Sequence, residues 1–242
     1  RDVTGVQTCA LPIFLLFGIM TELQTPDMGD VCEIGVAYGK SAIAMSQFRT
    51  SSKLYLYDIF SEEARQIAEN NIAKFGNPVD ITWRLQDTTQ LTFDEIKFDK
   101  WLRLLHIDGC HEHSAVLSDL QLFNSFMADN GVIVVDDFND QEYPGVKSAV
   151  IEFCLSKVNY KNWKIIAIGD NKAYIVQKKF QEQYQKAIVD YMVKAKREYN
   201  VPFELHMGLR EVLDTNVLMC DSRTSWDPEE IKESLFDKPV IG

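Results

Sequence analysis

Short apolar runs alternate with amphipathic segments along residues 30–179. The runs are rich in Val, Ile, Leu and Tyr, which is typical of strands, and the segments between them show helical spacing of apolar residues. Because the runs are continuously apolar, we expect a mostly parallel α/β sheet with helices on both faces. Strands are predicted at 30–35, 53–58, 79–85, 101–107 and 131–135, with a closing antiparallel pair at 163–168 and 173–177, and helices at 41–48, 62–75, 114–127 and 146–154.

The pattern changes after this region. An apolar stripe that includes Tyr184, Ile188 and Tyr191 predicts a helix over residues 181–199. Pro202 then ends the helix, because proline removes a backbone donor and clashes with the preceding turn.

We expect the α/β domain to span residues 14–179, with the two ends of the chain outside it. We expect residues 203–242 to be irregular with short helices, for example at 228–236. The C-terminal helical extension 180–242 would pack against the sheet or a partner subunit, or form part of a substrate lid. Residues 1–13 read RDVTGVQTCALPI, which resembles translated sequencing-adapter sequence, and we treat them as non-native. The end of a signal peptide is the weaker alternative, because no basic region or small-x-small cleavage site is present.

A glycine-containing turn, EIGVAYGKS at residues 33–41, follows the first strand and opens a helix. Its glycines let backbone amides approach a ligand, and a helix N-terminus favours a carboxylate or phosphate. Ala37 excludes the dinucleotide pattern GxGxxG, and the spacing of Gly35 and Gly39 is one residue short of a P-loop. The form E-x-G-x-x-x-G resembles the turn of class I S-adenosylmethionine (SAM) methyltransferases. A merely structural turn is the alternative.

Two acids follow the next two predicted strands. Asp58 lies 19 residues after Gly39, where a carboxylate can accept both ribose hydroxyls in NAD enzymes as well as SAM enzymes. Asp87 follows the third strand and could meet an adenine amino group, or it could be a solvated loop acid.

Three further acids end the fourth and fifth strands. Asp108 ends one of them and the pair Asp136 and Asp137 ends the other. Neighbouring strands lie about 4.8 Å apart, so these carboxylates can converge at the carboxyl edge of the sheet. They would repel one another without a cation, and hard carboxylate oxygens suit Mg²⁺, Mn²⁺ or Ca²⁺.

His111 lies on the loop that follows Asp108. A neutral imidazole there could take a proton from a substrate hydroxyl, although a lone loop histidine is more often structural. We interpret Glu112 and His113 as a helix N-cap region and Asp119 as a structural hydrogen-bonding residue.

Composition narrows the classes of partner. The chain has 36 Asp and Glu against 25 Lys and Arg, a net charge of −11 that disfavours binding to nucleic acid or to an anionic membrane. No apolar run reaches the ~18 residues of a membrane span. The five cysteines include no CxxC pair, which argues against a disulfide framework or structural zinc and for a reducing, cytoplasmic compartment.

Two segments resemble one known family. The segment IDGCHEHSAVLSDLQLFNSFMADNGVIVVDDF is similar to the block IDGxHxYxxVxxDLxxW…L…GGxxxxDD of metal-dependent class I O-methyltransferases. VCEIGVAYGKSA is similar to VxExGVxxGxSA of the macrocin and mycinamicin sugar O-methyltransferases. The resemblance covers residues 28–179 and departs from the pattern at Cys110 and Asn130.

The resemblance implies a fold, a site and a reaction. The fold would be a Rossmann-like doubly wound sheet of seven strands in the order 3-2-1-4-5-7-6. The reaction would be methyl transfer from SAM to a hydroxyl of a sugar or small natural product, in a homo-oligomer that binds no nucleic acid and no membrane. Asp108, Asp136 and Asp137 would ligate Mg²⁺ or another divalent cation, His111 would be the general base with Asp108 beside it, and Glu33, Gly35, Tyr38, Gly39, Ser41, Asp58, Asp87 and Asp108 would surround SAM.

Two other functions are left open. An NAD-linked oxidoreductase shares the strand, the turn and Asp58, but it lacks GxGxxG and leaves the acid cluster unexplained. A catalytically inactive SAM-binding or assembly protein would share the fold alone. Catechol-type O-methyltransferases resemble the chain less, because they carry Lys where this chain has His111.

Overall fold

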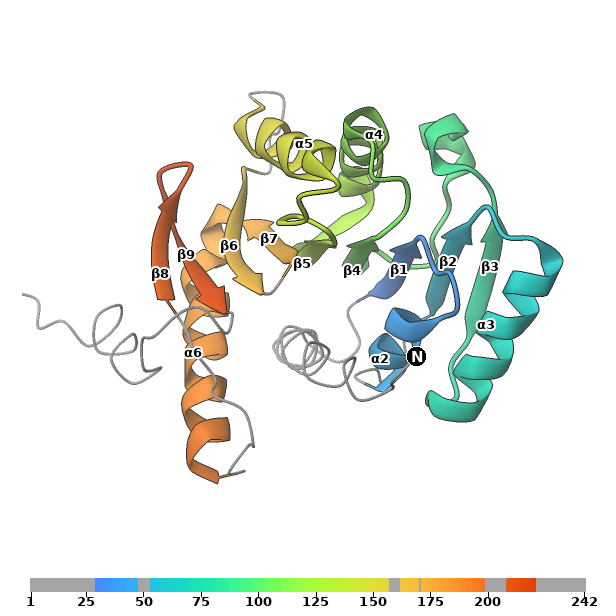
Figure 1. Cartoon of the computed structure of the whole chain (residues 1–242), viewed down its shortest axis with the longest axis horizontal. Helices are drawn as coiled ribbons and strands as arrows, with labels where there is room; N and C mark the ends of the chain where they lie inside the picture. Colours follow the sequence, from blue (N-terminus) through green and yellow to red (C-terminus); the bar gives the residue numbers. More distant parts are fainter. Residues whose placement is uncertain (1–28, 48–52, 157–161, 170, 199–207, 221–242) are drawn as a thin grey trace, which may run out of the picture.

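The computed structural model describes residues 29–47, 53–156, 162–169, 171–198 and 208–220. One nine-stranded sheet runs through these residues in the order β3-β2-β1-β4-β5-β7-β6-β9-β8 (Figure 1). The strands are β1 (Asp30–Ile34), β2 (Leu54–Asp58), β3 (Ile81–Leu85), β4 (Leu102–Ile107), β5 (Met127–Val135), β6 (Trp163–Gly169), β7 (Lys172–Gln177), β8 (Gly208–Val212) and β9 (Thr215–Cys220).

The first seven strands have the predicted order. β1 to β5 pair in parallel, and β7 is inserted antiparallel between β5 and β6. The prediction of a Rossmann-like, mostly parallel α/β sheet is therefore confirmed. The helices are α2 (Lys40–Gln47), α3 (Glu62–Phe75), α4 (His113–Phe123), α5 (Pro144–Leu155) and α6 (Gln181–Glu198), with short 3₁₀ turns η1 (Thr88–Gln90), η2 (Phe93–Glu95), η3 (Asn124–Phe126) and η4 (Lys178–Phe180).

The sheet continues beyond the seven predicted strands, which corrects the expectation of a purely helical extension. β9 pairs in parallel with β6, and β8 returns antiparallel to β9. Leu213 and Asp214 form the hairpin turn with φ of 52° and 57°. Non-glycine residues seldom take that conformation, so the sequence carries no ordinary turn signal there. The predicted helix at 228–236 and the segment 1–13 lie outside the described residues.

Two hydrophobic cores lie on opposite faces of the sheet. α2, α3 and α6 pack on one face, around Leu56 and Val134. α4 and α5 pack on the other face, around Tyr57 and Ile133 (Figure 1). Successive strand residues point to opposite faces of the sheet. Because helices cover both faces, both residues of a neighbouring pair are buried, and burial of each large side chain contributes ~1.5–3 kcal/mol to the stability. This double coverage explains the continuously apolar strands.

Local signals set the helix ends. The Ser61 hydroxyl caps α3 by accepting from the Ala64 amide at 3.2 Å, and the Gly76 amide donates to the Ile72 carbonyl at the other end. α4 ends at Phe123, four residues before the predicted end, because Asn124–Phe126 tighten into η3 before β5 begins. No helix in the described part of the chain is long and apolar enough to cross a membrane.

Candidate functional site

A cavity of about 520 Å³ opens at the carboxyl ends of β1, β2 and β4. Four of the predicted SAM-binding residues line it: Gly35, Asp58, Asp87 and Asp108. The other four, Glu33, Tyr38, Gly39 and Ser41, are not among its lining residues. The remaining lining residues are Ile34, Ala37, Tyr57, Ile59, Gln86, Thr88, Thr89, Gly109 and Cys110.

Gly35 allows β1 and β4 to approach each other at the edge of this cavity. Its φ is +83°, and a Cβ there would lie 1.9 Å from the carbonyl oxygen of Asp108. The Asp108 amide donates to the Ile34 carbonyl at 2.7 Å, which joins the two strand ends. Only glycine fits this close approach without displacing one of the strands.

Gly39 and Tyr38 both contact α3 from the turn. Gly39 has φ of +80° and faces Ile72 of α3, where a Cβ would lie 3.1 Å from Ile72 Cγ1. Tyr38 is 64% exposed, and its carbonyl accepts from Asn71 Nδ2 at 3.0 Å. These two residues therefore hold the turn against α3.

Asp58 holds the turn from the opposite side. Its Oδ2 accepts from the amide of Val36 at 2.7 Å and from the amide of Ala37 at 3.0 Å. Asp87 caps η1, where its Oδ1 accepts from the Thr89 amide at 3.0 Å and from the Thr89 hydroxyl at 2.7 Å. Both acids thus shape the wall of the cavity as well as lining it.

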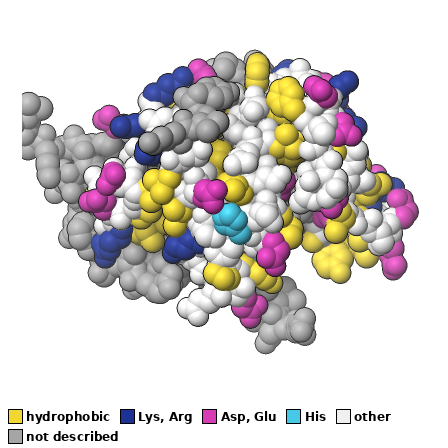
Figure 2. Space-filling model, turned by 90° about the horizontal axis from the view of Figure 1, so that it is seen from above, with side chains coloured by type: hydrophobic (Ala, Val, Ile, Leu, Met, Phe, Trp, Pro, Cys, Tyr) yellow, Lys and Arg dark blue, Asp and Glu magenta, His cyan; other side chains and the backbone are white. Residues whose placement is uncertain are grey.

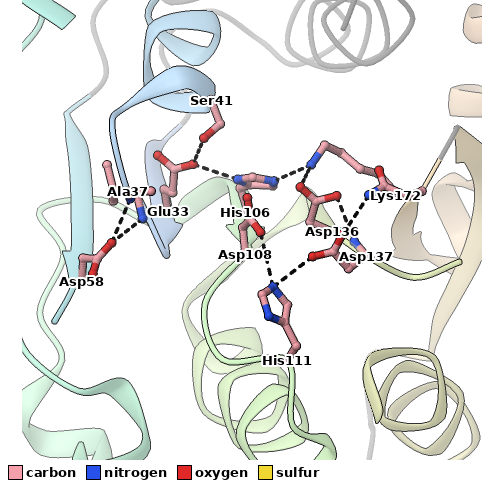
Figure 3. Close-up of polar contacts among 12 residues, drawn as sticks. Glu33, Ala37, Ser41, Asp58, His106, Asp108, His111, Asp136, Asp137 and Lys172 are labelled. Carbon is pink, nitrogen blue, oxygen red and sulfur yellow. Dashed lines mark hydrogen bonds and ion pairs between the residues drawn. The ribbon is translucent and has the colours of Figure 1, made fainter. Parts of the chain in front are cut away.

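His111 lies between two of the predicted metal-binding carboxylates (Figure 3). Its Nε2 lies 2.9 Å from Asp137 Oδ2 and 3.8 Å from Asp108 Oδ1. That nitrogen is buried and aligned for no hydrogen bond with the described residues. The Tyr143 ring stacks on the imidazole at a centroid distance of 4.1 Å, and Asn171 Nδ2 donates to Asp137 Oδ1 at 2.8 Å.

Asp136 faces away from His111 and contacts Lys172. The Lys172 ammonium donates to Asp136 Oδ2, and Asp136 Oδ1 accepts from the Asp137 amide at 2.9 Å. Lys172 Nζ also lies 3.3 Å from His106 Nε2, and His106 Nδ1 lies 2.9 Å from Glu33 Oε1.

Glu33 in turn accepts from the Ser41 hydroxyl. The buried chain of contacts from α2 to β5 is drawn in Figure 3. Glu33 and Ser41 thus belong to this chain, behind the cavity wall.

The three carboxylates Asp108, Asp136 and Asp137 differ in the direction of their pKa shifts. Burial, and then the neighbouring Asp136, raises the pKa of Asp108 to about 8. Burial, and then Asp136, also raises the pKa of Asp137. Burial alone would raise the pKa of Asp136 as well, but the Lys172 ammonium beside it holds that pKa below its ordinary value. Asp136 is therefore the carboxylate that the protein itself neutralises.

The acid–histidine cluster fits a divalent cation. Two overlapping sets of donor atoms lie within 4.8 Å of one another: His106 with Asp108 and Asp136, and Asp108 with His111 and Asp137. The buried His111 Nε2 makes no hydrogen bond with the described residues and lies between two carboxylate oxygens, where its lone pair can serve as a metal ligand. Hard oxygens with one imidazole suit Mg²⁺ or Mn²⁺.

Sequence reasoning missed four residues of this site: His106, Lys172, Asn171 and Tyr143. His106 lies opposite Glu33 in the pairing of β1 with β4, so that strand alignment could have identified the contact. Lys172 is the first residue of β7, and a lysine at a strand end usually suggests solvent exposure. Asn171 and Tyr143 carry no pattern that would have revealed them.

Asp119 is a buried acid that contacts Thr88 of the cavity wall. It is 1% exposed on α4, and burial raises its pKa to about 7, although a hydrogen bond with Thr88 opposes that shift. A carboxyl whose pKa rises on folding stabilises the fold fully below its unfolded pKa of about 4 and loses that contribution as the pH rises through 7.

Asp119→Asn should therefore unfold at a higher temperature than the parent chain at pH 8, by at least about 4 °C, roughly 1–2 kcal/mol. The difference should shrink as the pH falls to 5, where Asp119 is protonated in the folded protein. Circular dichroism melts across this pH range measure it, with exposed Asp94→Asn as the control. If Asp119→Asn has the same melting temperature as the parent at every pH, the pKa of Asp119 is not raised by folding.

Residues 32–138 match a family model described as a methyltransferase domain, Methyltransf_24. A comparison with curated protein sequences gives no match.

Solved structures share the fold at low identity. One is CalS11, a TDP-rhamnose 3'-O-methyltransferase of calicheamicin biosynthesis, with TM-score 0.53, 10% identity, and coverage of 69% of this chain and 80% of that one. Another is an rRNA methylase from Streptococcus thermophilus, with TM-score 0.51, 11% identity, and coverage of 69% and 96%. A third is SMU.1697c of Streptococcus mutans, solved with SAH, with TM-score 0.51, 11% identity, and coverage of 68% and 96%. The methyltransferase-domain match spans less than half of the chain, and the solved structures share its fold.

Proposed function

We propose that this chain is a SAM-dependent O-methyltransferase that methylates a hydroxyl of a sugar or small natural product, with a divalent cation and a histidine base. One observation carries the proposal: Asp108 lines the cavity and also belongs to both sets of candidate metal donors. A cofactor in the cavity and an acceptor over the acid–histidine cluster would therefore meet at one residue, as methyl transfer requires.

We assign SAM to the cavity. Asp58 would accept the ribose hydroxyls, Asp87 would lie toward the adenine, and Gly35 would give the cofactor close access to the backbone. The acidic surroundings suit a sulfonium cation. SMU.1697c, of the same fold, was solved with SAH, which supports this assignment. Glu33, Tyr38, Gly39 and Ser41 support the turn from behind.

We assign the divalent cation to Asp108, Asp136 and Asp137, which are divided between two donor sets that share Asp108, with Mg²⁺ as the first candidate. When bound, it would lower the pKa of the acceptor hydroxyl and stabilise the alkoxide. His111 would take the hydroxyl proton on Nε2, and the adjacent Asp137 carboxylate would stabilise the imidazolium that forms. The stacked Tyr143 ring would hold the imidazole in plane.

The transfer itself is a displacement in line. The acceptor oxygen would attack the methyl carbon of SAM, with the C–O bond forming as the C–S bond breaks and the bonding pair left on sulfur as SAH. His111 would hold the hydroxyl proton until solvent removes it. Positioning of the two reactants would supply most of the acceleration.

A small-molecule acceptor is favoured over RNA. CalS11 is described as a sugar O-methyltransferase, whereas an rRNA methylase has the same fold, so the fold alone does not choose. The net charge of −11 opposes binding to a phosphate backbone. Figure 2 shows acidic side chains on two sides of a surface histidine, a surface unlike an RNA-binding face.

We also propose that the protein is a cytoplasmic homo-oligomer.

Calorimetric titration with SAM and with NAD⁺ tests the cofactor. We expect SAM to bind and NAD⁺ not to bind. Asp58→Ala should weaken SAM binding at least about tenfold, since the turn amides lose their acceptor. Asp94→Ala, an exposed acid outside the cavity lining, should bind SAM normally.

Binding of NAD⁺ in place of SAM would contradict the proposal and favour the oxidoreductase. Methyl transfer from labelled SAM to a panel of nucleotide-linked sugars, with and without EDTA, then tests the reaction. SAM binding without turnover on any acceptor would favour the inactive SAM-binding protein. Turnover that EDTA leaves unchanged would remove the metal from the proposal.

A further inference from the structure

Lys172 is a buried ammonium that the proposed reaction does not use. Its side chain is 6% exposed at the start of β7, and it contacts Asp136 Oδ2 and His106 Nε2 (Figure 3). A buried charge is unfavourable unless it is paired and hydrogen-bonded. Lys172 therefore depends on the carboxylate next to the candidate metal site.

The two oxygens of Asp136 are both engaged. Oδ1 accepts from the Asp137 amide at 2.9 Å, and Oδ2 accepts from Lys172. By contrast, Asp108 Oδ1 and Asp137 Oδ2 both face the His111 nitrogen. A divalent cation in the cluster could contact Asp108 and Asp137 directly. Asp136, by contrast, is already paired with the Lys172 ammonium.

We propose that Lys172 is an internal counter-cation that competes with the divalent metal for Asp136 and so weakens metal binding to an exchangeable level. The inference rests on the proposed function in one respect, that the cluster binds a divalent cation. The ammonium acts in two ways: it occupies an oxygen of one proposed ligand, and it repels a second cation a few ångströms away in a weakly screened site. Removing it should strengthen metal binding.

A purely structural lysine would behave differently. Its loss would remove the contacts to Asp136 Oδ2 and His106 Nε2 and lower the stability, with no gain in metal affinity. Lys172→Met removes the charge at similar length, Lys172→Gln keeps a donor without the charge, and Lys172→Arg keeps the charge. Lys179 is the matched control, because it is 54% exposed and pairs with Asp129 at 2.7 Å.

Titration of the full chain with Mn²⁺, followed by electron paramagnetic resonance, tests the proposal. Lys172→Met and Lys172→Gln should bind Mn²⁺ at least about tenfold more tightly than the parent. Lys172→Arg and Lys179→Met should bind it as the parent does. Saturating Mn²⁺ should also raise the melting temperature of Lys172→Met more than that of the parent. If Lys172→Met is insoluble, the Lys172→Gln and Lys172→Arg pair makes the same comparison.

The outcomes separate this inference from the proposed function. If the parent binds Mn²⁺ and neither uncharged variant binds it more tightly, the inference is wrong and the proposed function stands. If only the uncharged variants bind Mn²⁺, Lys172 is the resident cation and the metal-dependent reaction is wrong. If no protein in the series binds Mn²⁺, both are wrong.

Discussion

His111→Ala should lower the turnover number by about 10²–10⁴ and leave SAM affinity unchanged. The imidazole Nε2 lies 2.9 Å from Asp137 Oδ2, among the acids proposed to hold the divalent cation, and His111 does not line the proposed cofactor cavity. Loss of a base that acts only in the transition state lowers kcat and kcat/KM together. The measurement is steady-state turnover at saturating SAM, with calorimetry for SAM binding.

His113→Ala is the matched control for this change. His113 lies two residues further along, and its Nε2 is 3.0 Å from Glu152 Oε2 on the exposed side of α5. Its removal should leave turnover at the parent level. A parallel loss of SAM affinity in His111→Ala would contradict the assigned role. Loss of Mn²⁺ binding in that variant would show that the free His111 nitrogen acts as a metal ligand instead of the base.

The central fold could be predicted because its signals are local. β1, β2, β4 and the second half of β5 are short, mostly apolar and buried runs, and α3 is marked by its own caps, Ser61 and Gly76. The hairpin of β8 and β9 could not be predicted in the same way. Its turn places Leu213 and Asp214 at positive φ, and β9 joins the sheet by pairing with β6, about fifty residues earlier in the chain.

The same distinction applies to the site. Asp108 and Asp137 come together because β4 and β5 are adjacent parallel strands whose carboxyl ends share one edge, which the strand–helix alternation implies. Lys172 reaches Asp136 only because β7 is inserted antiparallel beside β5, with Val135 opposite Ala173. That contact depends on strand pairing and not on a local pattern. The sequence near Lys172 therefore could not indicate that it contacts Asp136.

Gly35→Ala should damage both the fold and the proposed cofactor site. A Cβ at this position would lie 1.9 Å from the Asp108 carbonyl oxygen and 2.6 Å from the Gly109 amide nitrogen, and φ is +83°. The strained backbone costs about 1–2 kcal/mol and the overpacking about 1–3 kcal/mol more. For a chain of this size we expect the melting temperature to fall by at least about 6 °C.

Relief of the clash must separate the end of β1 from the end of β4, and Asp108 would move with it. SAM affinity should therefore fall at least about tenfold, and Mn²⁺ binding should weaken with it, since Asp108 belongs to both halves of the proposed site. Gly76→Ala is the control, because Gly76 is not among the cavity-lining residues although its Cβ would lie 2.7 Å from the Ile72 carbonyl oxygen. It should lose stability and keep both ligands. Recovery of Gly35→Ala only in the insoluble fraction would agree in direction with the expected loss of stability. A soluble Gly35→Ala protein with the parent's melting temperature and SAM affinity would show that β1 and β4 can separate without loss, and the close approach at Gly35 would then have no role in the site.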